Sequence, residues 1–182
     1  MLEGTWPPAY DSEELENSIS NLTARGIDAS DFYVASSPST PPRQGDIIRL
    51  ASGVPIVDDE CEPSVVDGLS DYWMLLGNTC DIDRNVTDVP YTLIAPIAIL
   101  TGVDEPTLKV FRQYSYYRRF YLPAWNDESD PGAAVDFTMQ VTLDKTTLGG
   151  CATHVASLTY CSWVLLNACL TRFTARSDGR HT

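Results

Sequence analysis

The amino-acid sequence predicts a mainly β, α+β protein: a small β-barrel with a C-terminal helix and an N-terminal helical arm. Three observations support this prediction. Short apolar runs bounded by turn residues recur through 45–143, as they do in domains built from short strands. Apolar residues after about His154 are spaced as on one face of a helix. A stretch rich in proline and serine, 36–44, separates the first residues from the rest.

The size and composition of the chain fit one globular domain. It has 182 residues, of which 43% are hydrophobic and 20% are charged. These values exclude collagen-like and wholly disordered proteins. We therefore expect an N-terminal helical arm over 1–35, a linker over 36–44, and a barrel-like domain with its C-terminal helix over 45–182.

The arm is predicted to contain one helix between Asp11 and Gly26. Asp11 or Ser12 can cap its start, acidic residues fill its first turn, and Gly26 can end it. Its apolar stripe consists of Leu15, Ile19 and Leu22. Because this stripe is narrow, the helix must dock either on the body of the protein or on a partner, and we take these three residues as candidate partner-binding residues.

The strands of the body are predicted in chain order from their apolar patterns. Strand signals occur at 45–50 and 54–57. The nearly continuous apolar runs at 72–76 and 91–100 are typical of buried strands, although periodicity alone does not exclude a buried helix. Segment 134–143 alternates as a half-exposed strand does. Its apolar face would hold Val135, Phe137, Met139, Val141 and Leu143.

The C-terminal helix is predicted from about His154 to Arg176. Basic residues near its end, Arg172 and Arg176, would suit the negative end of the helix dipole. The residues expected to stack on one face are Leu158, Cys161, Leu165, Cys169 and Phe173.

Charge and cysteine content limit the classes of partner and the cellular compartment that we expect. The formal net charge of −13 should repel nucleic acids and anionic membranes. The first residues lack an export signal, and the longest mostly apolar stretch, 155–170, is shorter than a bilayer requires. The five cysteines are an odd number, which favours reduced thiols over a disulfide framework. We expect a cytoplasmic protein, or one in the host cytoplasm if it is viral.

One basic and aromatic segment stands out in this acidic chain. Segment 111–121 contains six aromatic residues and three arginines. Interleaved aromatic and arginine side chains can stack on bases and neutralise phosphates. They can equally form a strand with alternate side chains in the core. The candidate nucleic-acid-binding residues are Arg112, Tyr116, Arg118 and Arg119.

A second candidate region follows the predicted strand at 72–76, where a strand end can present side chains to a cleft. The candidate cleft residues are Asn78, Cys80, Asp81 and Asp83. A nucleophilic Cys80 would need His154 as its base, whereas the nearby carboxylates disfavour a thiolate. Asp81 and Asp83 could contact a divalent ion, and Cys151 with His154 supplies only two of the ligands that zinc requires. The structural interpretation is preferred in each case, so we predict no catalytic residue, metal or cofactor.

The order of short motifs resembles a loosely defined group of bacterial and phage proteins. The motifs are Gly45-Asp-Ile-Ile48, Met74-Leu-Leu-Gly-Asn-Thr-Cys-Asp-Ile82, Leu93-Ile-Ala-Pro-Ile97, Arg119-Phe-Tyr-Leu-Pro123, Val135-Asp-Phe137 and Leu170-Thr-Arg-Phe-Thr-Ala-Arg176. The first strands also resemble the SH3-like barrel of MazF/PemK-type toxins, which are endoribonucleases. That family places a catalytic Ser or Thr after Ala-Pro-Ile and a catalytic Arg near the start of a strand. Here Ala98 follows Ile97 and no Arg stands directly before Trp73, so neither position is matched.

Two functional hypotheses follow. The first is a non-enzymatic protein-interaction module, in a context of phage and host conflict implied by the resemblance, that binds a protein partner through its acidic arm and barrel. The alternative is a divergent MazF-like endoribonuclease that binds RNA through 111–121.

Overall fold

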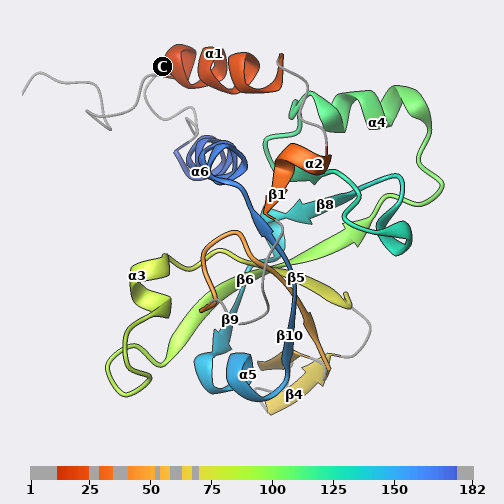
Figure 1. Ribbon diagram of the computed structural model, residues 1–182. Coiled ribbons are helices and arrows are strands. Elements are labelled where there is room, and N and C mark those ends of the chain that lie inside the picture. Colours follow the sequence, from red (N-terminus) through yellow and green to blue (C-terminus); the bar gives the residue numbers. More distant parts are fainter. Residues whose placement is uncertain are drawn as a thin grey trace, which may run out of the picture.

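The structure is a computed structural model that describes residues 12–24, 29–34, 41–51, 54–57, 63–66 and 70–175. Its centre is an eight-stranded antiparallel sheet that curls into a half-barrel. Figure 1 shows a layer of helices above this sheet and smaller elements below it. The predicted α+β class is confirmed, whereas the predicted small β-barrel is present as a curled antiparallel sheet.

The sheet has the order β1-β10-β2-β5-β6-β8-β7, and β9 also pairs with β6. Its strands are β1 (Tyr33–Val34), β2 (Ile47–Leu50), β5 (Tyr72–Leu75), β6 (Tyr91–Ile99), β7 (Arg119–Leu122), β8 (Ala133–Asp136), β9 (Val141–Asp144) and β10 (Ala152–Leu158). Strands β3 (Val54–Val57) and β4 (Pro63–Val66) form a separate two-stranded sheet. The helices are α1 (Ser12–Thr23), α2 (Ala29–Phe32), α3 (Thr79–Ile82), α4 (Glu105–Arg112), α5 (Lys145–Gly150) and α6 (Tyr160–Thr174).

Strand β5 is apolar throughout because both faces of the sheet are covered. Successive side chains of a strand point to opposite faces. Tyr72 and Met74 therefore join the larger core beneath α6, whereas Trp73 and Leu75 join a smaller core beside α3 and α5. The predicted strands at 45–50, 54–57, 72–76 and 91–100 are confirmed within one to two residues.

Strand β6 organises the curl of the sheet. It pairs with β5 along one edge, while its other edge pairs first with β9 and then with β8. The prediction of one continuous strand over 134–143 is wrong, because a 3-10 turn at Phe137–Met139 separates β8 from β9. The Asp136 carboxylate caps this turn by accepting the Thr138 N–H. Met139 is consequently 43% exposed rather than part of the core.

The predicted helix from about His154 begins later than expected. Residues 152–158 form β10, and α6 begins only after Thr159, whose hydroxyl accepts the Ser162 N–H. A threonine at this position favours the helix start because it satisfies an otherwise unpaired amide. Leu165 and Cys169 face the core as expected, whereas Cys161 is exposed.

Residues 29–34, which were assigned to the arm, lie within the body. Phe32 is fully buried, and Tyr33 pairs with Leu158 of β10 in an antiparallel register. The Thr159 N–H donates to the Phe32 carbonyl at 2.9 Å, and the Tyr33 hydroxyl donates to the Pro123 carbonyl at 2.6 Å. Of the predicted linker, 41–44 are described; 36–40, like the predicted caps Asp11 and Gly26, lie outside the described residues.

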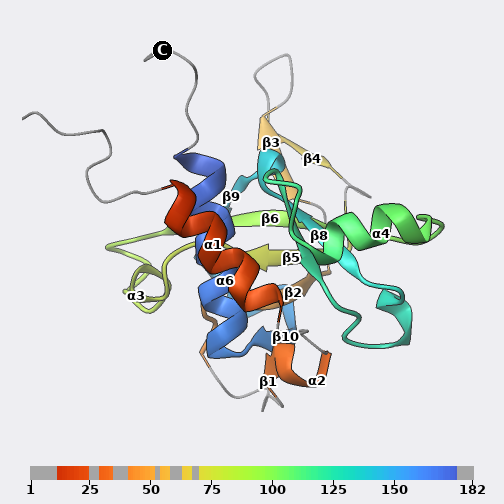
Figure 2. The same ribbon diagram turned by 90° about the horizontal axis from the view of Figure 1, so that it is seen from above.

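Helix α1 lies across α6 on the helical side of the sheet, as Figure 2 shows from above. Its apolar stripe faces the body: Ile19 is 2% exposed, and Leu15 and Leu22 pack partly buried against the same core. The Glu16 carboxylate accepts from Arg172 Nη1 of α6 at 3.1 Å. Arg172 Nη2 also donates to the Tyr114 carbonyl at 2.6 Å. The buried guanidinium of α6 therefore holds both α1 and the segment that follows α4. None of the helices described by the structure is long and apolar enough to span a bilayer.

Candidate functional site

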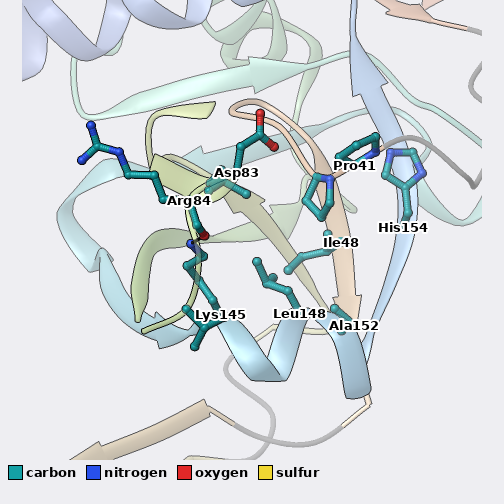
Figure 3. Close-up of a pocket in the computed structure, with 12 residues that line it drawn as sticks. Pro41, Ile48, Asp83, Arg84, Lys145, Leu148, Ala152 and His154 are labelled. Atoms are coloured by element: carbon teal, nitrogen blue, oxygen red, sulfur yellow. Dashed lines mark hydrogen bonds between the residues drawn. The ribbon is translucent and has the colours of Figure 1, made fainter. Parts of the chain in front are cut away.

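A pocket opens on the side of the sheet opposite to α6, beside α3 and α5. It has a volume of about 520 Å³ and is bounded by 41–42, by β2 and β10, and by the loop after α3. The apolar residues of its wall include Ile48, Ile82, Leu148 and Ala152, which extend the smaller core. Figure 3 shows the polar residues of the wall on either side of this apolar floor. These polar residues are Asp83, Arg84, Lys145 and His154.

The short helix α3 forms one side of the pocket and is held at both ends. Asn78 caps its start, because its side-chain oxygen accepts the Cys80 N–H at 2.9 Å. At the other end, Lys145 Nζ donates to the carbonyl oxygens of Asp81 at 2.8 Å and Arg84 at 2.6 Å. Carbonyls at a helix C-terminus lack helical partners and attract cations, so Lys145 of α5 fastens α3 to the sheet.

His154 lies at the opposite end of the pocket in a small polar cluster. Its Nε2 atom is 2.8 Å from Ser157 Oγ and 3.9 Å from Asp46 Oδ2. Burial raises the pKa of the Asp46 carboxyl, and the hydrogen bonds from Ser157 and the Arg43 backbone act in the opposite direction. In a Ser-His-Asp triad the serine and the acid engage opposite ring nitrogens. Here both lie nearest to the same nitrogen, so the cluster does not have the geometry of a triad.

The candidate cleft residues are close in sequence but serve different purposes. Asn78 is the helix cap, Asp83 lines the pocket, and the exposed Asp81 carboxylate lies 3.6 Å from Arg84 Nη1. Cys80 is exposed on α3. His154 contacts Ser157 and Asp46 through its ring nitrogen. The structure therefore does not pair His154 with Cys80 as the base that a nucleophilic thiol would need. In the described part of the chain, no group of three or more histidine, cysteine or acidic residues could hold a metal ion.

The basic and aromatic segment is divided between the core and the surface. Its buried aromatics are Phe111, Tyr114, Phe120 and Tyr121. Tyr116 and Tyr117 are 40% and 45% exposed, and the Arg118 guanidinium lies 5.9 Å from the Tyr117 ring centre. Two of its arginines pair with acids: Arg112 Nη1 lies 2.6 Å from Glu105, and Arg119 Nε lies 3.5 Å from Asp136. The buried aromatics of this segment therefore belong to the core, and its exposed side chains are the ones that a ligand could reach.

Sequence reasoning did not identify Lys145, Asp46 or Ser157 as residues of interest. Lys145 meets α3 across 64 positions of sequence, and no local pattern encodes such a contact. One weak signal exists, because Lys145 is one of only two lysines in the chain and follows an apolar strand directly. Asp46 belongs to the opening motif of the body, Gly45-Asp-Ile-Ile48, which does not mark it as a site residue.

Thiol reactivity should distinguish the four described cysteines, which are all free. Burial raises the pKa of the Cys169 thiol to about 12, so almost none of it is thiolate near neutral pH. We expect iodoacetamide at pH 8 to alkylate Cys80, Cys151 and Cys161 in the folded protein and to leave Cys169 unmodified, as measured by peptide mass spectrometry. Denaturation in urea should expose Cys169 to the same reagent. Alkylation of Cys169 in the folded protein at the rate of Cys80 would contradict its placement under α1.

No protein-family model and no curated protein matches this chain.

Proposed function

We propose that the chain is a non-enzymatic protein-interaction module that presents the acidic helix α1 on its sheet domain to a protein partner. The placement of α1 carries this proposal. Because the stripe residue Ile19 is buried against the body and Glu16 pairs with Arg172, α1 is held in one orientation. Leu15, Ile19 and Leu22 then serve to position the helix, which differs from the direct partner contact expected from the sequence.

The outward face of α1 is acidic, which indicates the chemistry of the partner. Glu13 and Glu14 are exposed, and the Glu16 side chain remains 56% exposed although it pairs with Arg172. The whole chain carries a net charge of −13. A partner with a basic surface would be attracted and oriented by this field, and its association would weaken as salt is added.

The proposed context and the finer fold rest on the resemblance over 45–176. We propose that the curled sheet is an open form of the SH3-like barrel of MazF/PemK-type toxins. The antiparallel succession of β2, β5 and β6 and the bend of β6 between β9 and β8 support this. The likeness to phage and bacterial proteins supports a role in phage and host conflict, and a cytoplasmic location would suit it.

A second candidate function, RNA binding and cleavage of the MazF type, is favoured by one surface. Tyr116, Tyr117 and Arg118 form an exposed aromatic and cationic group on an acidic molecule. Such a group can stack on the bases of a single strand. The partner-binding proposal is preferred because the ion pairs of Arg112 and Arg119 already occupy much of the positive charge of this segment.

Charge reversal on α1 tests the first proposal. A variant with Glu13→Lys and Glu14→Lys should lose the protein that co-purifies with the wild-type chain from its native cells, and added salt should release that protein from the wild type. The matched control reverses two exposed acids elsewhere, Asp88→Lys and Asp127→Lys, and should retain the partner. Equal retention by both variants would contradict a role for the acidic face of α1.

Single-stranded RNA separates the two functions. Under the first proposal, the purified chain shows no salt-sensitive RNA binding and no cleavage, with or without a divalent ion. Under the second, RNA is bound and cut, and Arg118→Glu abolishes its retention while the α1 variant does not. Fluorescence anisotropy of a labelled RNA measures the binding, and gel electrophoresis measures the cleavage.

A further inference from the structure

The pocket beside α3 contains a buried cation, Lys145, for which the described residues supply no ion-pair partner. Lys145 is only 7% exposed. Its ammonium takes part in none of the ion pairs found within 4.0 Å among the residues that the structure describes. Burying a charge is costly unless it is paired and hydrogen-bonded. The two carbonyl partners of Lys145 satisfy hydrogen bonds but carry no net negative charge.

The hydrogen-bonding capacity of this ammonium is also not exhausted. A lysine ammonium carries three N–H donors. Two of them donate to the carbonyl oxygens of Asp81 and Arg84, which leaves one donor in a residue that lines the pocket. In Figure 3 the charged ends of Asp83 and Arg84 extend away from Lys145. Asp144 is the nearest acid to Lys145 in the sequence. Its carboxylate accepts hydrogen bonds from the Thr146 N–H and the Thr146 hydroxyl.

The remainder of the pocket suits an apolar group. Ile48 and Leu148 lie between Lys145 and His154 in Figure 3, and Ala152 continues the floor along β10. A volume of about 520 Å³ is in the range of small-molecule sites. An apolar wall with one anchored cation at its end is complementary to an amphipathic anion.

We propose that this pocket binds a small carboxylic acid with an apolar body, whose carboxylate pairs with Lys145 and whose body rests on Ile48, Leu148 and Ala152. The same chemistry occurs in a free acid and in the C-terminal residue of a peptide. This site is on the opposite side of the sheet from α1, so it goes beyond the proposed partner surface and does not depend on it.

Paired probes test the site in the full-length protein by isothermal titration calorimetry. The first pair is 3-phenylpropionate and 3-phenylpropionamide, and the second is N-acetylphenylalanine and its amide. A hydrogen bond to a charged group contributes about 1.5–3 kcal/mol, so each acid should bind roughly tenfold or more tightly than its amide. Tighter binding of 3-phenylpropionate identifies a free acid as the ligand class, and tighter binding of N-acetylphenylalanine identifies a peptide C-terminus. Failure of both acids to bind, or equal binding of acid and amide, overturns the proposal.

Two variants locate the binding in this pocket. Lys145→Met should remove the preference for acids, while Lys109→Met, which changes the other lysine on exposed α4, should leave it intact. Because Lys145 also fastens α3, its variant is first compared with the wild type by near-ultraviolet circular dichroism. If the Lys145→Met spectrum is altered, Ala152→Phe is used as the deciding variant. Its larger side chain fills the apolar floor of the pocket, while the Lys145 ammonium is unchanged. Acid binding that survives Ala152→Phe unchanged overturns the proposal.

Discussion

Replacing Phe32 with alanine is expected to lower the free energy of unfolding by about 3–5 kcal/mol, the usual cost of truncating a buried phenylalanine. Phe32 is fully buried and packs on Phe120 with ring centres 6.2 Å apart and on Tyr33 at 5.1 Å. The cavity left behind would lie where the N-terminal segment meets the sheet. Urea unfolding followed by tryptophan fluorescence measures the change.

Val34 supplies the control for this experiment. It lies two residues further along on β1 but is 48% exposed, so Val34→Ala should change the stability by less than about 0.5 kcal/mol. A loss below about 1 kcal/mol for Phe32→Ala would mean that 29–34 belongs to a separable arm rather than to the sheet domain.

Replacing Ile19 with aspartate should release α1 from α6 and lower the stability by about 2–4 kcal/mol. The substitution removes a buried aliphatic side chain and places a carboxylate in its apolar site. It also places a negative charge three residues from Glu16 on the same helix, where like charges repel. Without its docking surface, a helix of 12 residues is marginal in water, so α1 should unfold as well as detach.

Amide hydrogen exchange measures this release directly. The amides of 12–24 should lose their protection in Ile19→Asp while those of β5 and β6 keep theirs. Ser18→Asp places the same charge one residue away on the exposed face of α1 and should preserve the protection. Protected α1 amides in Ile19→Asp would show that the helix is held by contacts other than its apolar stripe.

Strands β5 and β6 were predictable because their apolar runs are short and bounded by turn residues. The apolar runs of β5 and β6 reflect burial on both faces, which a sequence displays directly. The alternation over 134–143 is ambiguous, because Asp136 can cap a 3-10 turn without changing the apolar spacing. The start of α6 was misplaced for a related reason: apolar residues of β10 and α6 follow one another, and only Thr159 marks the boundary.

The candidate site was predictable in part. Of the four candidate cleft residues after β5, Asp83 lies in the wall of the pocket, whereas Asn78, Cys80 and Asp81 are not among the residues that line it. The cationic end of the pocket depends on Lys145, whose ammonium donates hydrogen bonds to backbone carbonyls of α3 and of the loop after it. A carbonyl is present at every residue, so such a partner leaves no trace in the side-chain pattern. The apolar stripe of α1 was visible, but whether the body or a partner covers it depends on the distant surface of α6.

The packing of 12–34 against 152–174 constrains how the protein can fold during its synthesis. β1 pairs with β10, α1 packs on α6, and Thr159 donates through its hydroxyl to the Asp31 carbonyl. Residues 12–34 therefore cannot complete their packing during synthesis until 152–174 have left the exit tunnel. Until then, Phe32 and the apolar stripe of α1 lack their packing partners and expose apolar groups to water, where chaperones can bind them.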